Sequence, residues 1–86
     1  MYDFRWLDSA LDALADIYVA ATVPDRERMA TGVERFNRRI ALNPNDVGES
    51  RDGGYRVDFP PLLVVYFHVD DMRREVEVTF IARFGR

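Results

Sequence analysis

Residues 62–84, LLVVYFHVDDMRREVEVTFIARF, decide the fold of this chain. Two runs, 62–69 and 75–84, place apolar residues at every second position, and a short polar stretch, 70–74, separates them. A period of two is typical of strands that bury one face, and so short a connection joins neighbouring antiparallel strands. The stretch therefore predicts a β-hairpin. Its expected inward side chains are those of Leu63, Val65, Phe67 and Val69 in the first strand and Val76, Val78, Phe80, Ala82 and Phe84 in the second.

Two shorter segments, 55–59 and 2–7, show the same period of two. In the first, we expect the apolar side chains to face the core and Arg56 and Asp58 to lie on the opposite face. In the second, the side chains expected on the core face are those of Tyr2, Phe4 and Trp6. The sequence therefore predicts one strand before the helices and three after them.

Between these strands the apolar period changes to that of a helix. One helix is predicted from Asp8 to the Val23-Pro24 pair, because proline disfavours an α conformation in the residue before it. A second helix begins near Pro24 or Asp25 and ends at the loop that starts with Asn43. The expected buried stripes are Leu7, Leu11, Leu14, Tyr18 and Ala21, widened by Ala10 and Ile17, in the first helix and Met29, Val33, Phe36 and Ile40 in the second.

The order of these elements predicts the fold class. The two helices are similar in expected length and a short connection joins them, so we expect an antiparallel helix hairpin. The order β-α-α-β-β-β then gives an α+β fold, with the helix hairpin packed on one face of a small, mostly antiparallel sheet whose other face stays open. With 86 residues the chain is too short for two ordinary domains, so residues 1–86 are expected to form one domain.

Composition narrows the classes of function. The chain contains no cysteine, which excludes disulfides, thiolate metal sites and cysteine nucleophiles. Its 12 basic and 15 acidic residues give a net charge of −3, so an overall basic field for nucleic acid is absent. All the basic residues are arginine, and any basic side chain that contacts phosphate or carboxylate must therefore be a guanidinium. Without a signal peptide or an apolar run of about 18–20 residues, we expect a cytoplasmic protein with no membrane partner.

Charged residues form a stripe on each predicted helix. On the first helix the stripe is acidic, with Asp8, Asp12 and Asp16, and on the second it is basic, with Arg28, Arg35 and Arg39. We expect the two stripes to face each other across the hairpin and to neutralise each other locally. The alternative is that one stripe docks a partner of opposite charge.

The open face of the predicted sheet carries the side chains that are most able to take part in a chemical reaction. Strand alternation places there a set that suits phosphodiester chemistry: Arg56, Tyr66, His68, Glu77 and Arg83. The hairpin turn sets His68, the only histidine, beside Glu75 or Glu77. Histidine can transfer a proton near neutral pH, a carboxylate can orient it, and arginine can hold a phosphate. The alternative is an ordinary solvated face with cross-strand ion pairs. We expect no metal site, because His68 has no second histidine or cysteine beside it.

Residues 49–86, ESRDGGYRVDFPPLLVVYFHVDDMRREVEVTFIARFGR, resemble the C-terminal half of the RelE/ParE superfamily of toxins from bacterial type II toxin–antitoxin systems. The shared features are a glycine loop that runs into YRV at 55–57, a strand that contains VY at 65–66, an acidic turn, and a final V-x-V-x-x-I strand. The aromatic first strand, the two helices and the NP pair at 43–44 resemble the first half of the same family.

This resemblance implies a toxin that a cognate antitoxin wraps and silences. RelE-type members cleave mRNA on the ribosome, whereas ParE-type members inhibit DNA gyrase without a known nuclease site. The expected partners are therefore an antitoxin protein and either the ribosome with mRNA or DNA gyrase, with no small-molecule cofactor. The alternative is a non-toxic protein-binding module that retains the fold.

The resemblance assigns two residues for a nuclease, and the chemistry of the open face supplies the other candidates. Arg56 matches the first basic residue of the corresponding strand in the family, Arg86 matches the basic residue after the final strand, and Asp58 stands where a second basic residue is usual. The candidate catalytic residues are His68 as acid or base, Glu77 to orient it, Arg56 and Arg83 to hold the phosphate, and Tyr66. The candidate nucleic-acid contacts are Arg51, Arg56 and Arg86. As a non-enzymatic inhibitor, the protein would use its helices or its sheet surface instead.

Overall fold

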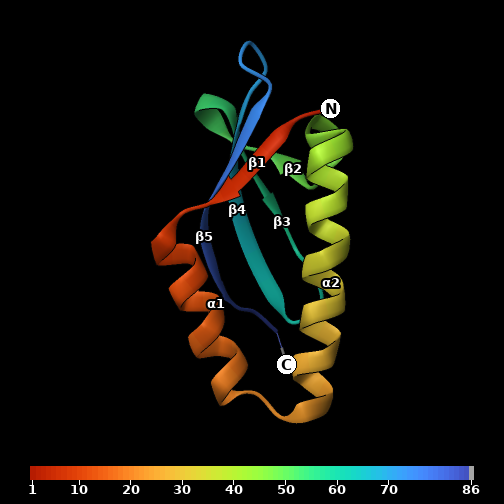
Figure 1. Cartoon of the computed structure of the whole chain (residues 1–86), viewed down its shortest axis with the longest axis vertical. Coiled ribbons are helices and arrows are strands. Elements are labelled where there is room, and N and C mark those ends of the chain that lie inside the picture. The colour runs from red at the N-terminus through yellow and green to blue at the C-terminus, as the bar shows by residue number, and fades with distance from the viewer. Residues whose placement is uncertain (86) are drawn as a thin grey trace.

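The computed structural model describes residues 1–85, which form two helices against a five-stranded sheet (Figure 1). The elements are β1 (Asp3–Trp6), α1 (Asp8–Ala20), α2 (Val23–Leu42), β2 (Glu49–Ser50), β3 (Tyr55–Asp58), β4 (Leu63–Asp70) and β5 (Glu75–Arg83). Short 3₁₀ segments, η1 (Pro44–Asp46) and η2 (Asp52–Gly54), lie on either side of β2. The predicted α+β fold with the order β-α-α-β-β-β is confirmed, and β2 is an addition that the sequence pattern did not indicate. Neither helix is long and apolar enough to cross a membrane, over the residues described.

The sheet has the strand order β1-β5-β4-β3-β2. The pairs β4–β5, β3–β4 and β2–β3 are antiparallel, whereas β1 joins the free edge of β5 in parallel. The predicted hairpin is thus the centre of the sheet, and His68 lies opposite Glu77 across it. Because a parallel pair needs a crossover connection, the two helices between β1 and the hairpin provide it and cover one face of the sheet.

The second helix begins where the sequence supplies a cap. Thr22 is the N-cap, and its hydroxyl accepts a hydrogen bond from the backbone N–H of Asp25 at 3.3 Å, while Pro24 stands in the first turn. The predicted stripe of Met29, Val33, Phe36 and Ile40 is buried, as expected. The helix begins at Val23, one residue before the earliest predicted position.

The first helix is rotated relative to the prediction. Leu11 is 48% exposed, whereas Ala10 and Leu14 are buried. The reason is that α1 packs against β5, and the helix face that meets this strand is centred on Ala10, Leu14 and Ile17. The helix also ends earlier than predicted, at Ala20, so the two helices have 13 and 20 residues and are not similar in length.

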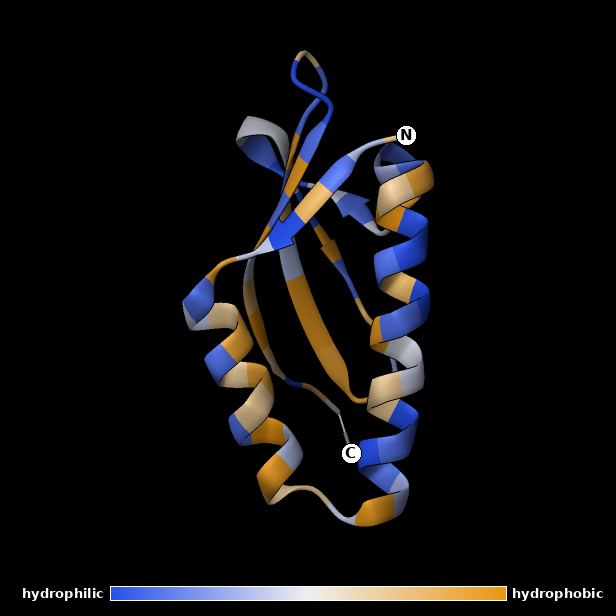
Figure 2. Ribbon diagram, viewed as in Figure 1, coloured by the Kyte–Doolittle hydropathy of each residue, from blue (hydrophilic) through white to orange (hydrophobic). Residues whose placement is uncertain are grey.

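The two helices cover the same face of the sheet, but they diverge from their connection instead of packing along each other (Figure 1). Each helix turns its apolar side toward the sheet (Figure 2), and a common core lies between them. Within residues 1–85 no ion pair links the acidic stripe of α1 to the basic stripe of α2. The expectation that these stripes face each other across an antiparallel hairpin is therefore wrong.

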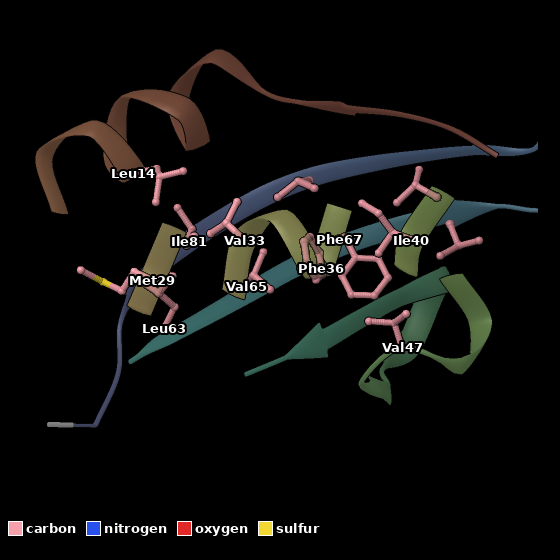
Figure 3. Close-up of a cluster of buried hydrophobic side chains, with 13 residues drawn as sticks. Leu14, Met29, Val33, Phe36, Ile40, Val47, Leu63, Val65, Phe67 and Ile81 are labelled. Carbon is pink, nitrogen blue, oxygen red and sulfur yellow. The ribbon is translucent and has the colours of Figure 1, made fainter. Parts of the chain in front are cut away.

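Phe36 lies at the middle of the hydrophobic core (Figure 3). Its ring meets the ring of Phe67 edge-on, with centroids 5.3 Å apart, and the ring of Trp6 at 6.3 Å. The indole N–H of Trp6 donates to the side-chain oxygen of Asn37 at 3.0 Å, which satisfies its polar atom. This cluster joins α2 to both the hairpin and β1.

A β-bulge in β5 changes which side chains face the core. Tyr66 lies opposite Phe80 and Phe67 lies opposite Val78, so Thr79 is an extra residue without a partner on β4. Beyond the bulge the alternation is reversed, and Ile81 is 3% exposed whereas Phe80 is 51% exposed. The prediction that Phe80 points inward is therefore wrong, and the same reversal applies to the rest of β5.

Three segments distant in sequence meet at Asp71, in the turn between β4 and β5. Its carboxylate accepts hydrogen bonds from the hydroxyl of Tyr2 at 2.7 Å and from the side-chain amide of Asn45 at 2.8 Å. The guanidinium of Arg74 lies 4.8 Å from the centroid of the Tyr2 ring. The hydrogen bonds from Tyr2 and then from Asn45 lower the pKa of Asp71, and the same bond raises the pKa of Tyr2.

We expect Phe36→Ala to lower the free energy of unfolding by about 3–5 kcal/mol, because it leaves a cavity among packed rings. Chemical denaturation monitored by circular dichroism measures this change. Leu11→Ala is the control, since the exposed side chain of Leu11 can be shortened without a cavity. Equal effects of the two substitutions would contradict the position assigned to Phe36.

We expect Asp71→Asn to reduce stability in a pH-dependent way. The folded pKa of Asp71 lies below its ordinary value of 3.8, so the ionised carboxylate stabilises the fold above that pH and loses its effect as pH falls through the folded value. The difference in unfolding free energy between the parent protein and Asp71→Asn is therefore constant near neutral pH and shrinks below about pH 4. Urea denaturation at several pH values tests this. A difference that is the same at every pH would show that ionisation of Asp71 is not involved.

Candidate functional site

The open face of the sheet brings together three of the predicted site residues. His68 and Glu77 lie opposite each other in the β4–β5 register, and Tyr66 is two residues before His68 on the same face. The carboxylate of Glu77 forms an ion pair with the guanidinium of Arg5 on β1. The predicted proximity of His68 and Glu77 is therefore confirmed, but Glu77 pairs with an arginine rather than with the imidazole.

His68 holds the loop that precedes β3. Its Nε2 lies 3.0 Å from the carbonyl oxygen of Gly53, so this ring nitrogen carries a proton and donates it. The ring of Tyr55 meets the imidazole edge-on, with centroids 4.9 Å apart. These contacts fix the imidazole against η2 and give His68 a structural role. Proton transfer at Nε2 would require the bond to Gly53 to break.

Arg56 lies on the other side of the sheet. In the β3–β4 register it is opposite Phe67, a core residue, so it faces the helices. Its guanidinium donates to the carbonyl oxygens of Val47 at 2.8 Å and Gly48 at 3.1 Å. The expectation that Arg56 and Asp58 lie on the open face is wrong. The carboxylate of Asp58 lies 3.9 Å from the guanidinium of Arg39 on α2. The two polar side chains are tolerated on the helix side because each has a polar partner there.

Arg83 also faces the helices. The bulge at Thr79 reverses the alternation of β5, and Arg83 pairs with Leu63 of the core face. Its guanidinium donates to the carboxylate of Asp25, in the first turn of α2, at 2.8 Å. The expected position of Arg83 on the open face is therefore wrong, and this ion pair ties the end of β5 to the start of α2.

The remaining predicted nucleic-acid contacts are not brought together. Arg51 follows β2, where its guanidinium donates to the carbonyl oxygen of Ser50 at 3.0 Å and lies 3.4 Å from the carboxylate of Glu49. Arg86 lies outside the residues that the structure describes. The structure thus separates Arg56 and Arg83 from the face that carries His68, while the guanidinium of Arg51 is engaged by its neighbours in β2.

A hollow of about 550 Å³ adjoins His68 on the open face, between β1 and the β4–β5 turn. Two arginines line it, Arg5 and Arg73, and sequence periodicity could not place Arg73 because it belongs to the turn. Four carboxylates line the same hollow: Asp3, Asp70, Glu75 and Glu77. An excess of carboxylates repels phosphate, so this hollow suits a cationic or neutral group better than a nucleic-acid backbone.

Aromatic side chains dominate the rest of the open face. Tyr66 packs against Phe80 with centroids 5.8 Å apart, and Tyr55 packs against His68, so three aromatic rings of this face are partly exposed. We call Tyr55, Tyr66 and Phe80 the open-face aromatic cluster. Sequence reasoning missed it because the cluster depends on the bulge in β5 and on the reversed alternation of β3. Exposed apolar patches of this kind are typical of protein-binding surfaces.

Comparison with solved structures shows which known proteins share this architecture. It superposes with a TM-score of 0.74 on a chain of the chromosomal ParDE TA system from P. aeruginosa, at 18% identity, over 99% of this chain and 98% of the other. The isolated E. coli RelE toxin gives a TM-score of 0.68 at 13% identity, over 100% of this chain and 87% of the other. The chain has the RelE/ParE toxin fold.

Comparisons of the sequence with family profiles and with curated proteins do not detect this relationship. No protein-family profile matches the chain, and no curated protein matches it. A chain of the intact E. coli RelBE toxin–antitoxin complex also has the RelE/ParE toxin fold of this protein, with a TM-score of 0.67 and 13% identity over 100% of both chains. Identities this low establish the fold, and the function has to be argued from the surface of this chain.

We expect Gly54→Ala to destabilise the protein more than Gly53→Ala. Both glycines have positive φ, 82° and 72°, so alanine at either position carries strain of about 1–2 kcal/mol. At Gly54 alone, a Cβ would lie 2.9 Å from Nε2 of His68 and 3.3 Å from the carbonyl oxygen of Val69. Denaturation curves together with the NMR signals of the His68 ring measure the difference. Matching curves and unchanged ring signals would contradict the role of His68 in holding η2.

Proposed function

We propose that this protein is the toxin-like component of a toxin–antitoxin pair and that it acts in the cytoplasm by binding a protein target. The RelE/ParE toxin fold extends over the whole chain and supports the toxin-like role. The observation that carries the mode of action is the composition of the open face, which presents an aromatic cluster where a nuclease would need arginines.

Three features argue against RNA cleavage by the predicted residues. Arg56 and Arg83 are held on the helix side of the sheet by Val47, Gly48 and Asp25. The hollow beside His68 contains more carboxylates than arginines. The net charge of −3 opposes the approach of a polyanion. Together these features place Arg56 and Arg83, the arginines expected to hold the scissile phosphate, away from the imidazole.

The open-face aromatic cluster suits a protein partner instead. Tyrosine and phenylalanine are enriched in the centres of protein interfaces, because they bury a large area at small cost in conformational entropy. DNA gyrase, the target that the ParE resemblance implies, is the first candidate for the protein that this face blocks. A cognate antitoxin that covers Tyr55, Tyr66 and Phe80 would silence the protein by competing for the same surface.

A nuclease is the second candidate function, with the ribosome and mRNA as partners. The observation in its favour is that His68, Glu77 and Tyr66 share one face beside a hollow that contains Arg5 and Arg73. In this case His68 transfers a proton through Nδ1, oriented by its bond to Gly53, and the turn arginine holds the phosphate. A non-toxic binding module that keeps the fold is the further alternative.

We expect induced expression to arrest growth and co-expression with the adjacent gene to restore it, with the two products co-purifying. The arrest persists in His68→Gln, because glutamine can still donate to the carbonyl of Gly53. The arrest is lost in the double variant Tyr66→Ala, Phe80→Ala, which removes an exposed aromatic pair without leaving a cavity. Met72→Ala, in the exposed β4–β5 turn, is the matched control for loss of a surface apolar side chain.

The outcomes separate the three functions. Loss of mRNA cleavage by a factor on the order of 10²–10⁴ in His68→Gln would establish the nuclease and overturn the proposal. Inhibition of DNA supercoiling by the parent protein and by His68→Gln alike supports it. Normal growth on expression of the folded protein, with the partner still co-purifying, would identify a binding module.

A further inference from the structure

The basic stripe of α2 is a surface that the proposed function does not use. Arg28, Arg35 and Arg39 lie at helical spacing on the side of the helix that carries Gly32, and all three are exposed. The stripe is on the helix-covered side of the sheet, whereas the open-face aromatic cluster is on the other side. Because α1 diverges from α2, its acidic stripe does not neutralise these arginines.

A groove runs along this stripe between α2 and the β3–β4 connection. A hollow of about 490 Å³ is lined by Pro24, Glu27, Arg28, Thr31, Gly32, Arg35 and Pro61. A second hollow of about 130 Å³ continues it toward Arg39 and Asp58, and the two share Gly32, Arg35 and Pro61. A Cβ on Gly32 would lie 2.7 Å from Cδ of Pro61, so the absence of a side chain here lets the proline loop close against the helix. The groove floor is therefore formed by Gly32 packed closely against Pro61, and it is apolar.

The charges along the groove are only partly compensated. Arg39 lies 3.9 Å from the carboxylate of Asp58, at one end. Within residues 1–85, Arg28 and Arg35 form no ion pair with a carboxylate of the chain. A protein with a net charge of −3 thus has a local positive groove with two guanidinium groups available to a ligand.

We propose that this groove binds an extended acidic segment of a partner protein. Arg28 and Arg35 are seven residues apart, or about 10.5 Å along the helix axis. Three residues of an extended or polyproline II chain span about 9–10 Å, so two carboxylates three positions apart reach both arginines. Each guanidinium can bind a carboxylate through two parallel hydrogen bonds, while Pro61 and Gly32 contact apolar side chains of the segment, such as proline rings.

The spacing of charges favours a peptide over a nucleic acid. A single strand of nucleic acid carries a phosphate at every nucleotide and needs a continuous positive track with exposed rings for stacking. Here the arginines are about 10.5 Å apart along α2, and the carboxylates of Glu27 and Asp58 interrupt the track. A segment with few, widely spaced carboxylates can keep its charges away from Glu27 and Asp58. A nucleic-acid backbone, with a phosphate at every nucleotide, brings negative charge next to both.

The test uses the whole protein labelled with ¹⁵N and the acetylated peptide Pro-Glu-Pro-Pro-Glu-Pro-Pro-Glu-Pro. We expect the amide signals of Thr31, Gly32 and Leu62 to shift on titration, and the binding to weaken with added salt. Arg35→Glu weakens binding by about tenfold or more, because it replaces attraction by repulsion at the shared wall of the two hollows. Arg38→Glu is the matched control, since it makes the same charge change on an exposed neighbour that does not line the groove.

Several results would overturn the proposal. If a peptide with glutamine in place of glutamate shifts the same signals equally, the groove does not recognise charge. Equal weakening by Arg35→Glu and Arg38→Glu would indicate diffuse attraction without a groove. Groove shifts with an oligothymidine strand and none with the peptide would assign the surface to nucleic acid. Because no readout is growth arrest, these outcomes are independent of whether the protein is toxic.

Discussion

One extra residue in β5, Thr79, determines what each face of the sheet presents. Its hydroxyl donates to the carbonyl of Tyr66 at 3.3 Å, and the strand on either side of it pairs normally with β4. Beyond this point Ile81 joins the core, Arg83 reaches Asp25 on α2, and Phe80 turns outward to pack on Tyr66. The core and the aromatic surface therefore depend on the same local irregularity, which is characteristic of bulges near functional surfaces.

The consequence is a familiar architecture with an unusual surface. The fold matches solved toxins along the whole chain, yet two arginines that were expected to hold a phosphate, Arg56 and Arg83, act as internal ties. Arg56 satisfies two carbonyls near the start of β2, and Arg83 joins a strand end to a helix start. Since a fold can carry different chemistries, these side-chain positions are what favour protein binding over RNA cleavage in this chain.

Sequence patterns predicted those parts of the structure in which one strong period dominates. The stripe of α2 and the hairpin pairing of His68 with Glu77 are confirmed because burial on one face determines the period. The faces of β3 and of the end of β5 were wrong. Arg56 and Asp58 look like solvent-facing residues until their partners, Val47 and Arg39, are known, and these partners belong to other elements of the fold. Among Thr79, Phe80 and Ile81, nothing in the residue types marks the bulge.

The parallel pairing of β1 with β5 has a consequence for the order of events during synthesis. The two strands are 72 residues apart at the Arg5–Glu77 pair, and β5 lies between β1 and β4 in the sheet. β1 thus has no neighbour in the sheet until β5 emerges from the ribosome, and β5 is itself an interior strand. Contacts between such distant segments form slowly, because a long loop must close first. β1 therefore joins the sheet only after β5 has been made.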